Sequence, residues 1–399
     1  MAERLAGRAP FLILVIVLSA TMLRGPILAV APVAEQIGSD LQVGAGVVGL
    51  LTTIPVLCFA VCSPAAIAII RRTGPDLALT LTLIGVVAGS VLRSLDGIVV
   101  ALLGTAVLGA FVTIGNVVLP IIIAREFDAR RAHTMTGVYT SALNVGTMAV
   151  TIGTAPLADA VGWRWAIASW SVFAVAALAC WAALRGVRRA FSVAPRAAAP
   201  VAAAGHPRVQ VLRQGASWLL AAAFCGQAFA FYAISAWLPT LLVDQGFDSS
   251  GAGAVAALFQ LGGIVGGVLL PVISLRRSIL TAVVCVGLGW LTVPLGFLFL
   301  PSAWLAWCLI GGVAQGGGMT MIFIMLVAFG DDERTSVGRS GMVQGAGYSV
   351  AATGPLLLGA LHEATAGWTV PLLVELVAVL LFLVPGALVA RRFRGHAAG

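Results

Sequence analysis

Long apolar segments alternate with short polar intervals along the whole chain, and this pattern predicts membrane-spanning helices. A helix needs about 20 apolar residues to cross a bilayer. Twelve such segments can be counted, at approximately residues 10–34, 43–70, 77–94, 97–124, 132–158, 163–185, 215–243, 250–275, 278–300, 303–329, 338–361 and 368–390. We therefore expect an all-α integral membrane protein with twelve transmembrane helices.

Arginines at the ends of alternate segments predict the orientation of these helices. Placing the N-terminus in the cytoplasm puts 20 of the 23 arginines into the tails and the inner loops. Examples are the pairs Arg71-Arg72, Arg276-Arg277 and Arg391-Arg392. Because positive residues stay on the cytoplasmic side, we expect a multi-pass protein of the bacterial inner membrane with both termini in the cytoplasm.

One longer polar interval, at residues 185–213, divides the segments into six plus six. It is rich in arginine, alanine and proline, a composition typical of a linker. We expect an N-terminal six-helix bundle at residues 1–190, a cytoplasmic linker at residues 191–213 and a C-terminal six-helix bundle at residues 214–399.

The two halves of the chain share sequence features at one spacing. Arg71-Arg72 matches Arg276-Arg277, and Gly162-Trp163 matches Gly367-Trp368, both at a shift of 205 residues. Such internal repetition indicates a duplicated, pseudo-symmetric pair of bundles.

Arg24 lies near the centre of the first apolar segment. A charged residue at this depth costs at least ~2.5–3.5 kcal/mol, so its side chain should face protein or water. It could bind an anion, or it could cap carbonyl groups freed by a kink at Gly25-Pro26. Pro32 matches Pro239 at a shift of 207 residues, and on that register Phe231 takes the place of Arg24, so this charge belongs to one half only.

Neutral polar and aromatic residues occur at similar depth in the other segments expected to line a central path. Each one alone could make an interhelical hydrogen bond. Together they predict a substrate cavity around one cation, suited to a small, flat or weakly charged solute. The candidate substrate-binding residues are Arg24, Asn116, Tyr139, Asn144, Gln227, Tyr232, Gln260, Gln315, Gln344 and Tyr348.

Two further patterns predict packing inside the bundles. Thr136, Thr140, Thr147 and Thr151 share one helix face with Asn144, and their hydroxyls could line the cavity or bond their own helix carbonyls. Glycine pairs Gly262/Gly266 and Gly263/Gly267 and the run at residues 316–318 predict close helix contacts.

The distribution of charge excludes several classes of protein. Only 10% of residues are charged, and the net charge of +8 comes from arginines at segment ends, which argues against nucleic-acid binding. Of 15 acids, Glu375 alone lies inside a segment body, in the twelfth segment. No paired carboxylates and no clustered cysteines and histidines are evident, so we expect no enzyme activity, no cofactor and no metal.

Several sequence blocks in one order resemble a known family, the cyanate and 2-nitroimidazole transporters of the major facilitator superfamily. The blocks include Leu23-Arg24-Gly25-Pro26, Gly115-Asn116-Val117-Val118-Leu119-Pro120, Ala236-Trp237-Leu238-Pro239 and Ser340-Gly341-Met342-Val343-Gln344-Gly345-Ala346-Gly347-Tyr348. The resemblance implies twelve helices, alternating access, and substrates that are small anions or small planar heterocycles.

The loop between the second and third segments departs from the superfamily's pattern Gly-x-x-x-Asp-Arg-x-Gly-Arg-Arg. Only Arg72-x-Gly74 survives; Arg71 stands where the aspartate belongs, and Pro75-Asp76 replaces the last two basic residues. The usual gating salt bridge is therefore left without the aspartate that the pattern supplies. Our gating candidates are the two equivalent arginine pairs, Arg71 with Arg72 and Arg276 with Arg277.

These observations favour a secondary active transporter, an importer of a small anion or small planar polar solute, in which Arg24 holds the negative group. The alternative is a proton-coupled multidrug efflux pump. A transporter-like sensor and an embedded enzyme are disfavoured. The expected partners are a small-molecule substrate and the lipid bilayer, with no nucleic acid, and we expect a monomer.

Overall fold

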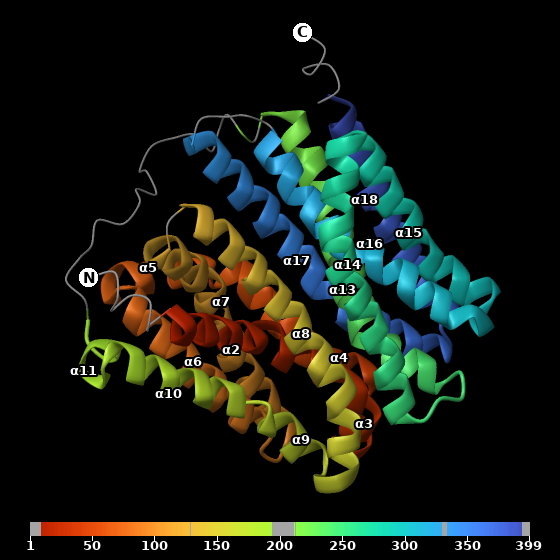
Figure 1. Ribbon diagram of the computed structural model, residues 1–399. Helices are drawn as coiled ribbons and strands as arrows, with labels where there is room; N and C mark the ends of the chain where they lie inside the picture. The colour runs from red at the N-terminus through yellow and green to blue at the C-terminus, as the bar shows by residue number, and fades with distance from the viewer. Residues whose placement is uncertain (1–8, 128, 194–210, 212, 329–332, 393–399) are drawn as a thin grey trace. The chain divides into compact units, whose positions relative to one another are not determined.

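The computed structural model describes residues 9–127, 129–193, 211, 213–328 and 333–392, and every regular element in them is helical (Figure 1). Nine helices in this part are long and apolar enough to span a membrane, or ten if one bent pair forms a single span. The helices α8 (Ala129–Val161) and α17 (Glu333–Thr365) add two more of 33 residues each. The fold is all-α, as predicted, and these helices account for the twelve segments.

Contacts divide the chain into two compact units. Unit 1 comprises residues 1–41 and 61–201, and unit 2 comprises residues 42–60 and 202–399. Most of the linker predicted at residues 191–213 lies outside the described residues, so the bundle boundaries stay a prediction. The other helices of unit 1 are α2 (Ala9–Leu28), η1 (Ala31–Val33), α3 (Ala34–Leu41), α5 (Ser63–Thr73), α6 (Pro75–Arg93), α7 (Ile98–Glu126), α9 (Trp163–Ser169), α10 (Val172–Arg185) and α11 (Val187–Ala190).

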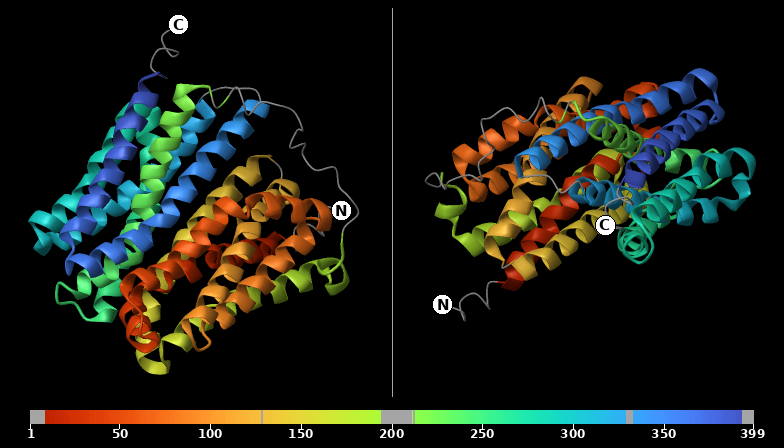
Figure 2. Two further views of the ribbon diagram at one scale, coloured as in Figure 1. Left: turned by 180° about the vertical axis from the view of Figure 1, so that it is seen from behind. Right: turned by 90° about the horizontal axis from the view of Figure 1, so that it is seen from above.

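Unit 2 is built mainly from long helices that run beside one another. Besides α17 these are α4 (Ala45–Val61), α13 (Gly215–Val243), α14 (Ser249–Arg276), α15 (Ile279–Phe299), α16 (Trp304–Ala328) and α18 (Thr369–Arg392), and the short 3-10 helix η2 (Pro301–Ala303) lies between α15 and α16. The helices α17 and α18 both lie along α13 in every view (Figures 1 and 2).

Prolines break the first two spans. The first span runs over 32 residues, but α2 ends at Leu28 and is followed by a turn, η1 and α3. Pro32 lies in η1 and has no N–H to continue the helical ladder. In the second span, α4 and α5 meet at an angle of 62°, and Pro64 occupies the first turn of α5. The apolar segment at residues 43–70 is therefore a bent pair of helices.

Glycines let helix backbones approach closely where the sequence predicted it. A Cβ at Gly262 would lie 2.9 Å from the backbone of Gly312, and one at Gly316 would overlap the carbonyl of Gly263. These contacts join α14 and α16, so the predicted packing is confirmed there. Gly267 is the exception, because the nearest atom to a Cβ there is the Thr320 hydroxyl at 3.9 Å.

The duplication is visible as a hydrogen bond that occurs once in each unit. The Trp163 indole Nε1 donates to the Asp40 carboxylate at 3.0 Å in unit 1. The Trp368 indole Nε1 donates to the Asp244 carboxylate at 2.7 Å in unit 2. The tryptophans are 205 residues apart and the aspartates 204. Each bond ties the start of the last span of its unit to the end of the first span, which supports the repeat.

The α14–α16 contact yields a stability prediction with a matched control. Gly316→Ala should lower the free energy of unfolding by about 1–3 kcal/mol, because the added methyl group overlaps the Gly263 carbonyl. Gly267→Ala should leave stability unchanged or slightly raised, because it meets open space and gains helix propensity. Thermal unfolding of both variants in detergent measures the difference. Equal midpoints would contradict the packing described here.

Candidate functional site

Arg24 lies in the body of α2, four residues before the helix ends, and its side chain is half-buried. The helices α2 and α8 pack closely here, with Thr21 against Gly146 and Gly25 against Val150. Both contacts have a shift of 125 residues, so the two helices run parallel in one register. On this register Asn144 lies level with residue 19, below Arg24. Since helical side chains lean toward the N-terminus, the Arg24 side chain extends toward the level of Asn144.

Asn116 lies at the same depth in unit 1 as Arg24. Its neighbour Gly115, on α7, approaches Leu23, with 2.5 Å between a Cβ at Gly115 and the Leu23 Cδ2. Leu23 is the residue before Arg24, and Asn116 is the residue after Gly115. Asn116 therefore lies beside the point where this part of α2 contacts α7. Both Asn116 and Asn144 are half-buried. Arg24 and Asn116 thus lie at one depth of unit 1, and Asn144 lies about 7.5 Å further along the helix axis, on the side toward which the Arg24 side chain leans.

Other residues of α8 take different roles. Tyr139 is buried and lies five residues before Asn144, about 7.5 Å along the helix axis. The hydroxyls of Thr147 and Thr151 donate to their own helix carbonyls at 2.9 and 2.8 Å, so this part of the threonine stripe is satisfied locally. The side chains of Thr136 and Thr140 lie outside the described part.

Gln227 is the centre of a hydrogen-bond network in unit 2. Its Nε2 donates to the Gln315 backbone carbonyl at 3.0 Å, and its Oε1 accepts from the Trp290 indole at 2.9 Å. The three residues come from α13, α16 and α15, and all are buried. This arrangement is typical of an interhelical tie rather than a group waiting for a ligand.

Gln260 and Gln315 each have a buried side-chain polar atom without a hydrogen-bond partner in the described structure. The Gln260 Nε2 is 3.4 Å from the Ser235 hydroxyl, but its Oε1 has no partner in the described structure. The Gln315 Nε2 also has none, and it lies against Gly263, one turn from Gln260 on α14. A buried acceptor and a buried donor therefore lie on one helix contact of unit 2.

The remaining candidates of unit 2 lie on α13 and α17. Tyr232 is buried beside Phe231, the repeat equivalent of Arg24, with ring centroids 4.9 Å apart. The Tyr348 ring makes edge contacts with Phe59 and Phe224 at 5.5 and 5.4 Å. The Gln344 Nε2 donates to the Ser340 hydroxyl of its own helix at 2.7 Å.

The four gating candidates are exposed and lie at equivalent helix ends. Arg71 and Arg72 form the last turn of α5, and Arg276 with Arg277 ends α14. Cations at a helix C-terminus interact favourably with the helix dipole. Their gating role stays a prediction.

Comparison with known proteins decides the family. A family profile described as the Major Facilitator Superfamily matches residues 11–337. The chain belongs to the Major Facilitator Superfamily. It is 30% identical over 384 residues to the 2-nitroimidazole transporter of Escherichia coli K12, covering 94% of both proteins. It is 24% identical over 359 residues to the cyanate transport protein CynX of the same organism, covering 88% of this chain and 90% of the relative.

Solved structures of this superfamily have the same fold. A bacterial homologue of the human lysosomal transporter Spinster superimposes with a TM-score of 0.73 at 15% identity, covering 97% of this chain and 98% of the other. The D-xylose-proton symporter gives a TM-score of 0.72 at 12% identity, covering 96% of each chain. The protein is thus a multi-pass membrane transporter, not an enzyme, and the family resemblance is confirmed.

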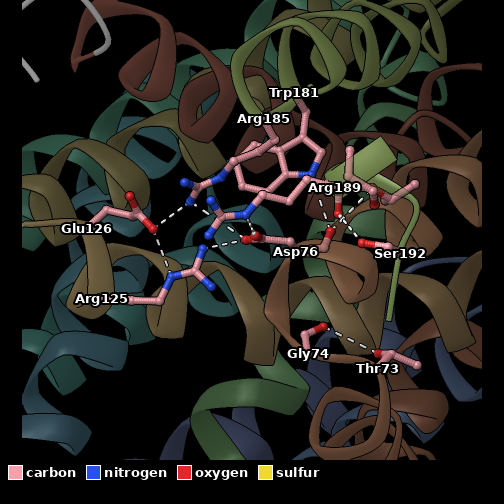
Figure 3. Close-up of polar contacts among 11 residues, drawn as sticks. Thr73, Gly74, Asp76, Arg125, Glu126, Trp181, Arg185, Arg189 and Ser192 are labelled. Atoms are coloured by element: carbon pink, nitrogen blue, oxygen red, sulfur yellow. Dashed lines mark hydrogen bonds and ion pairs between the residues drawn. The ribbon is translucent and has the colours of Figure 1, made fainter. Parts of the chain in front are cut away.

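Asp76, which replaces a basic residue of the superfamily loop pattern, is the centre of a charge cluster that the sequence did not reveal (Figure 3). It lies in the first turn of α6, with its side chain 6% exposed. It pairs with Arg125 of α7, with Arg185 of α10 at 3.6 Å and with Arg189 of α11 at 3.5 Å. The cluster therefore joins four helices of unit 1 around one carboxylate.

Two more residues complete this cluster (Figure 3). The Glu126 carboxylate pairs with Arg125 at 2.8 Å and with Arg185 at 2.5 Å. The Trp181 indole donates to the Asp76 backbone carbonyl at 3.2 Å, and the Arg185 guanidinium lies 4.7 Å from the Trp181 ring centroid. An acid at one helix start and arginines at the neighbouring helix ends were the available signal, but only the tertiary packing brings them together.

The cluster predicts that Asp76 is important for stability. Asp76→Asn should lower the free energy of unfolding by roughly 3 kcal/mol, because it removes the central charge from partly buried arginines. Asp96→Asn is the control: Asp96 also pairs with an arginine, Arg164, at 2.7 Å, but its side chain is 93% exposed, so the loss should stay below ~1 kcal/mol. Unfolding in mixed detergent micelles measures both. A larger loss at Asp96 would contradict this ranking.

The two buried glutamines of unit 2 should respond differently to substitution. Gln227→Leu should cost about 1–3 kcal/mol, because it leaves the Trp290 indole N–H without an acceptor. Gln315→Leu should cost less, since the bond to Gln227 uses the Gln315 backbone carbonyl and the Gln315 Nε2 has no partner among the described residues. Thermal unfolding of the purified variants measures the difference. A greater loss in Gln315→Leu would contradict the network described.

Proposed function

We propose that this transporter moves a small anion or a small planar polar solute by alternating access. We place it in a bacterial inner membrane, with both termini in the cytoplasm. The observation that carries the proposal is the position of Arg24 in the body of a membrane helix, at the depth of Asn116 and leaning toward the level of Asn144.

Arginine is suited to such a substrate for a geometric reason. Its planar guanidinium presents several N–H donors in a fixed fork and keeps its charge at every physiological pH. A neighbouring amide can both donate and accept, so it can bind the remaining polar edge of a small solute. A cation with two amides therefore favours a compact, electron-rich ligand over a bulky apolar one.

The names of the two relatives point to the same chemistry. Cyanate is a small anion, and a nitroimidazole is a planar ring whose nitro oxygens carry partial negative charge. Each presents a negatively polarised oxygen or nitrogen that an arginine can bind. The relatives support this substrate class without deciding between its members.

Unit 2 offers polar groups that suit the planar members of this class. The Gln260 Oε1 is an acceptor and the Gln315 Nε2 a donor, and both are buried with no hydrogen-bond partner in the described structure. An azole ring carries one N–H donor and one nitrogen acceptor in its plane. We propose that these two glutamines contribute to solute selection.

A proton-coupled multidrug efflux pump remains the second candidate because of Glu375. This carboxyl group is fully buried in α18, and within the described residues neither of its oxygens has a hydrogen-bond partner. Buried acids of membrane helices commonly act in proton relays. Efflux predicts transport that follows a pH gradient and accepts bulky apolar cations.

Transport by protein in liposomes tests the leading proposal. Cyanate, nitrite, formate and 2-nitroimidazole are offered in turn, and saturable uptake or exchange of at least one is expected. Arg24→Gln should reduce transport of the anions at least about 100-fold, because it removes the charge that binds them. Arg24→Lys should retain part of it, because a point charge remains.

Arg392→Gln is the matched control, since Arg392 is exposed at the end of α18 and its substitution should leave uptake unchanged. Anion uptake that survives in Arg24→Gln would contradict the role of Arg24. Transport of bulky cations driven by a pH gradient alone, with no uptake of the small solutes, would favour the efflux pump instead.

A further inference from the structure

Arg93 is a second arginine that the structure places inside protein. It is the last residue of α6, and its side chain is 1% exposed. Close packing against α7 contributes to this burial, because a Cβ at Gly104 would overlap the Arg93 backbone. In the sequence, Arg93 lies near the end of the apolar segment at residues 77–94 and is one of the three arginines outside the tails and inner loops.

One nitrogen of the Arg93 guanidinium is held by the break in the first span. The Nη1 donates to the Pro26 backbone carbonyl at 2.8 Å. Pro26 lies two residues before α2 ends, where the helical hydrogen bonds stop and carbonyl groups need other donors. A cation at this C-terminal end is also favoured by the dipole of α2. This bond orients the guanidinium plane.

The other two nitrogens have no hydrogen-bond partner within the described structure. They are Nε and Nη2. These two atoms form one edge of the guanidinium, with parallel N–H bonds, and this edge binds the two oxygens of a carboxylate side by side. The bond from Nη1 to Pro26 thus leaves a complete two-donor fork unused.

A buried charge in this state is costly. A desolvated cation needs a counter-charge, and each unsatisfied donor adds a further penalty. The acids near the outer ends of these helices do not supply the counter-charge, since Asp40 and Asp96 both pair with Arg164. In the described residues Arg93 forms no ion pair.

We propose that the Nε–Nη2 edge of Arg93 is an anion-binding site for a planar anion with two oxygens, such as a carboxylate or nitrite. The anion accepts two parallel hydrogen bonds and neutralises the buried charge. The site uses a different residue on a different helix from Arg24, so it stands whether or not Arg24 binds the transported solute.

Access to this site depends on the broken part of the first span. An anion reaches the buried fork only when a neighbouring segment moves. The break between α2 and η1 lies beside the guanidinium. The backbone at this break lacks some of the hydrogen bonds of a continuous helix. Movement there disrupts fewer hydrogen bonds than movement of an intact helix, so binding of the anion should be slow compared with diffusion.

Stabilisation of the purified full-length protein by formate tests the proposal. Formate is the smallest carboxylate, and chloride keeps the ionic strength constant as a spherical comparison anion. Formate should raise the unfolding temperature saturably, because a ligand of the folded state stabilises it. Arg93→Lys keeps the charge but loses the fork, so the apparent affinity for formate should fall at least about tenfold.

Arg24→Gln separates this site from the proposed transport site. Formate should still stabilise this variant saturably, because the Nε–Nη2 edge of Arg93 is intact in it. If formate stabilises Arg93→Lys as well as the unsubstituted protein, or if Arg24→Gln alone loses the effect, the proposal is wrong. A result in which formate and chloride act alike in the unsubstituted protein also overturns it.

A second measurement needs no variant and serves if Arg93→Lys does not fold. Crystals of the unsubstituted protein grown with formate are compared with crystals grown with chloride in its place. Planar density on the Nε–Nη2 edge of Arg93 is expected with formate and not with chloride. The absence of such density at saturating formate would refute the site.

Discussion

The bilayer interior offers no hydrogen bonds to a polypeptide backbone, and the structure depends on how the chain meets this constraint. Intact helices satisfy their own N–H and carbonyl groups. At the prolines of the first span some backbone carbonyl groups have no N–H partner within the helix, and side chains donate hydrogen bonds to them instead. The Arg93 guanidinium bonds the Pro26 carbonyl. The proposed substrate-binding residues Arg24 and Asn116 lie near this broken helix, where a charge, an irregular backbone and close packing occur together.

Much of the fold followed from the sequence because its causes are local. Apolar length predicts a span, and arginines at segment ends predict the side of the membrane. Small residues at helical spacing predicted the contacts of Gly262 and Gly316, although Gly267 on the same helix meets open space. The helical face of a glycine can be read from spacing, but which neighbouring helix approaches it depends on tertiary packing.

The candidate site was only partly predictable for the same reason. Arg24 was identified from its cost in a membrane segment, a property of one residue in one environment. Gln227 and Gln260 were both predicted from an amide at mid-membrane depth. The Gln227 amide makes hydrogen bonds with the Trp290 indole and the Gln315 backbone carbonyl, whereas the Gln260 Oε1 has no hydrogen-bond partner in the described structure. Asp76 gave only the weak signal of an acid at a helix start, which is ordinary until three arginines converge on it. Residue type indicates capacity for hydrogen bonding, and packing decides how much of it is used.

The hydrogen bond between Arg93 and Pro26 also affects the binding of metal cations at the end of α2. In transporters with discontinuous helices, carbonyl groups at such C-terminal ends coordinate sodium ions. Here a guanidinium already occupies the Pro26 carbonyl. A sodium ion at this point would meet a fixed positive charge and fewer available oxygens. The first span therefore carries its own cation at the break, and this charge disfavours a sodium ion at the Pro26 carbonyl.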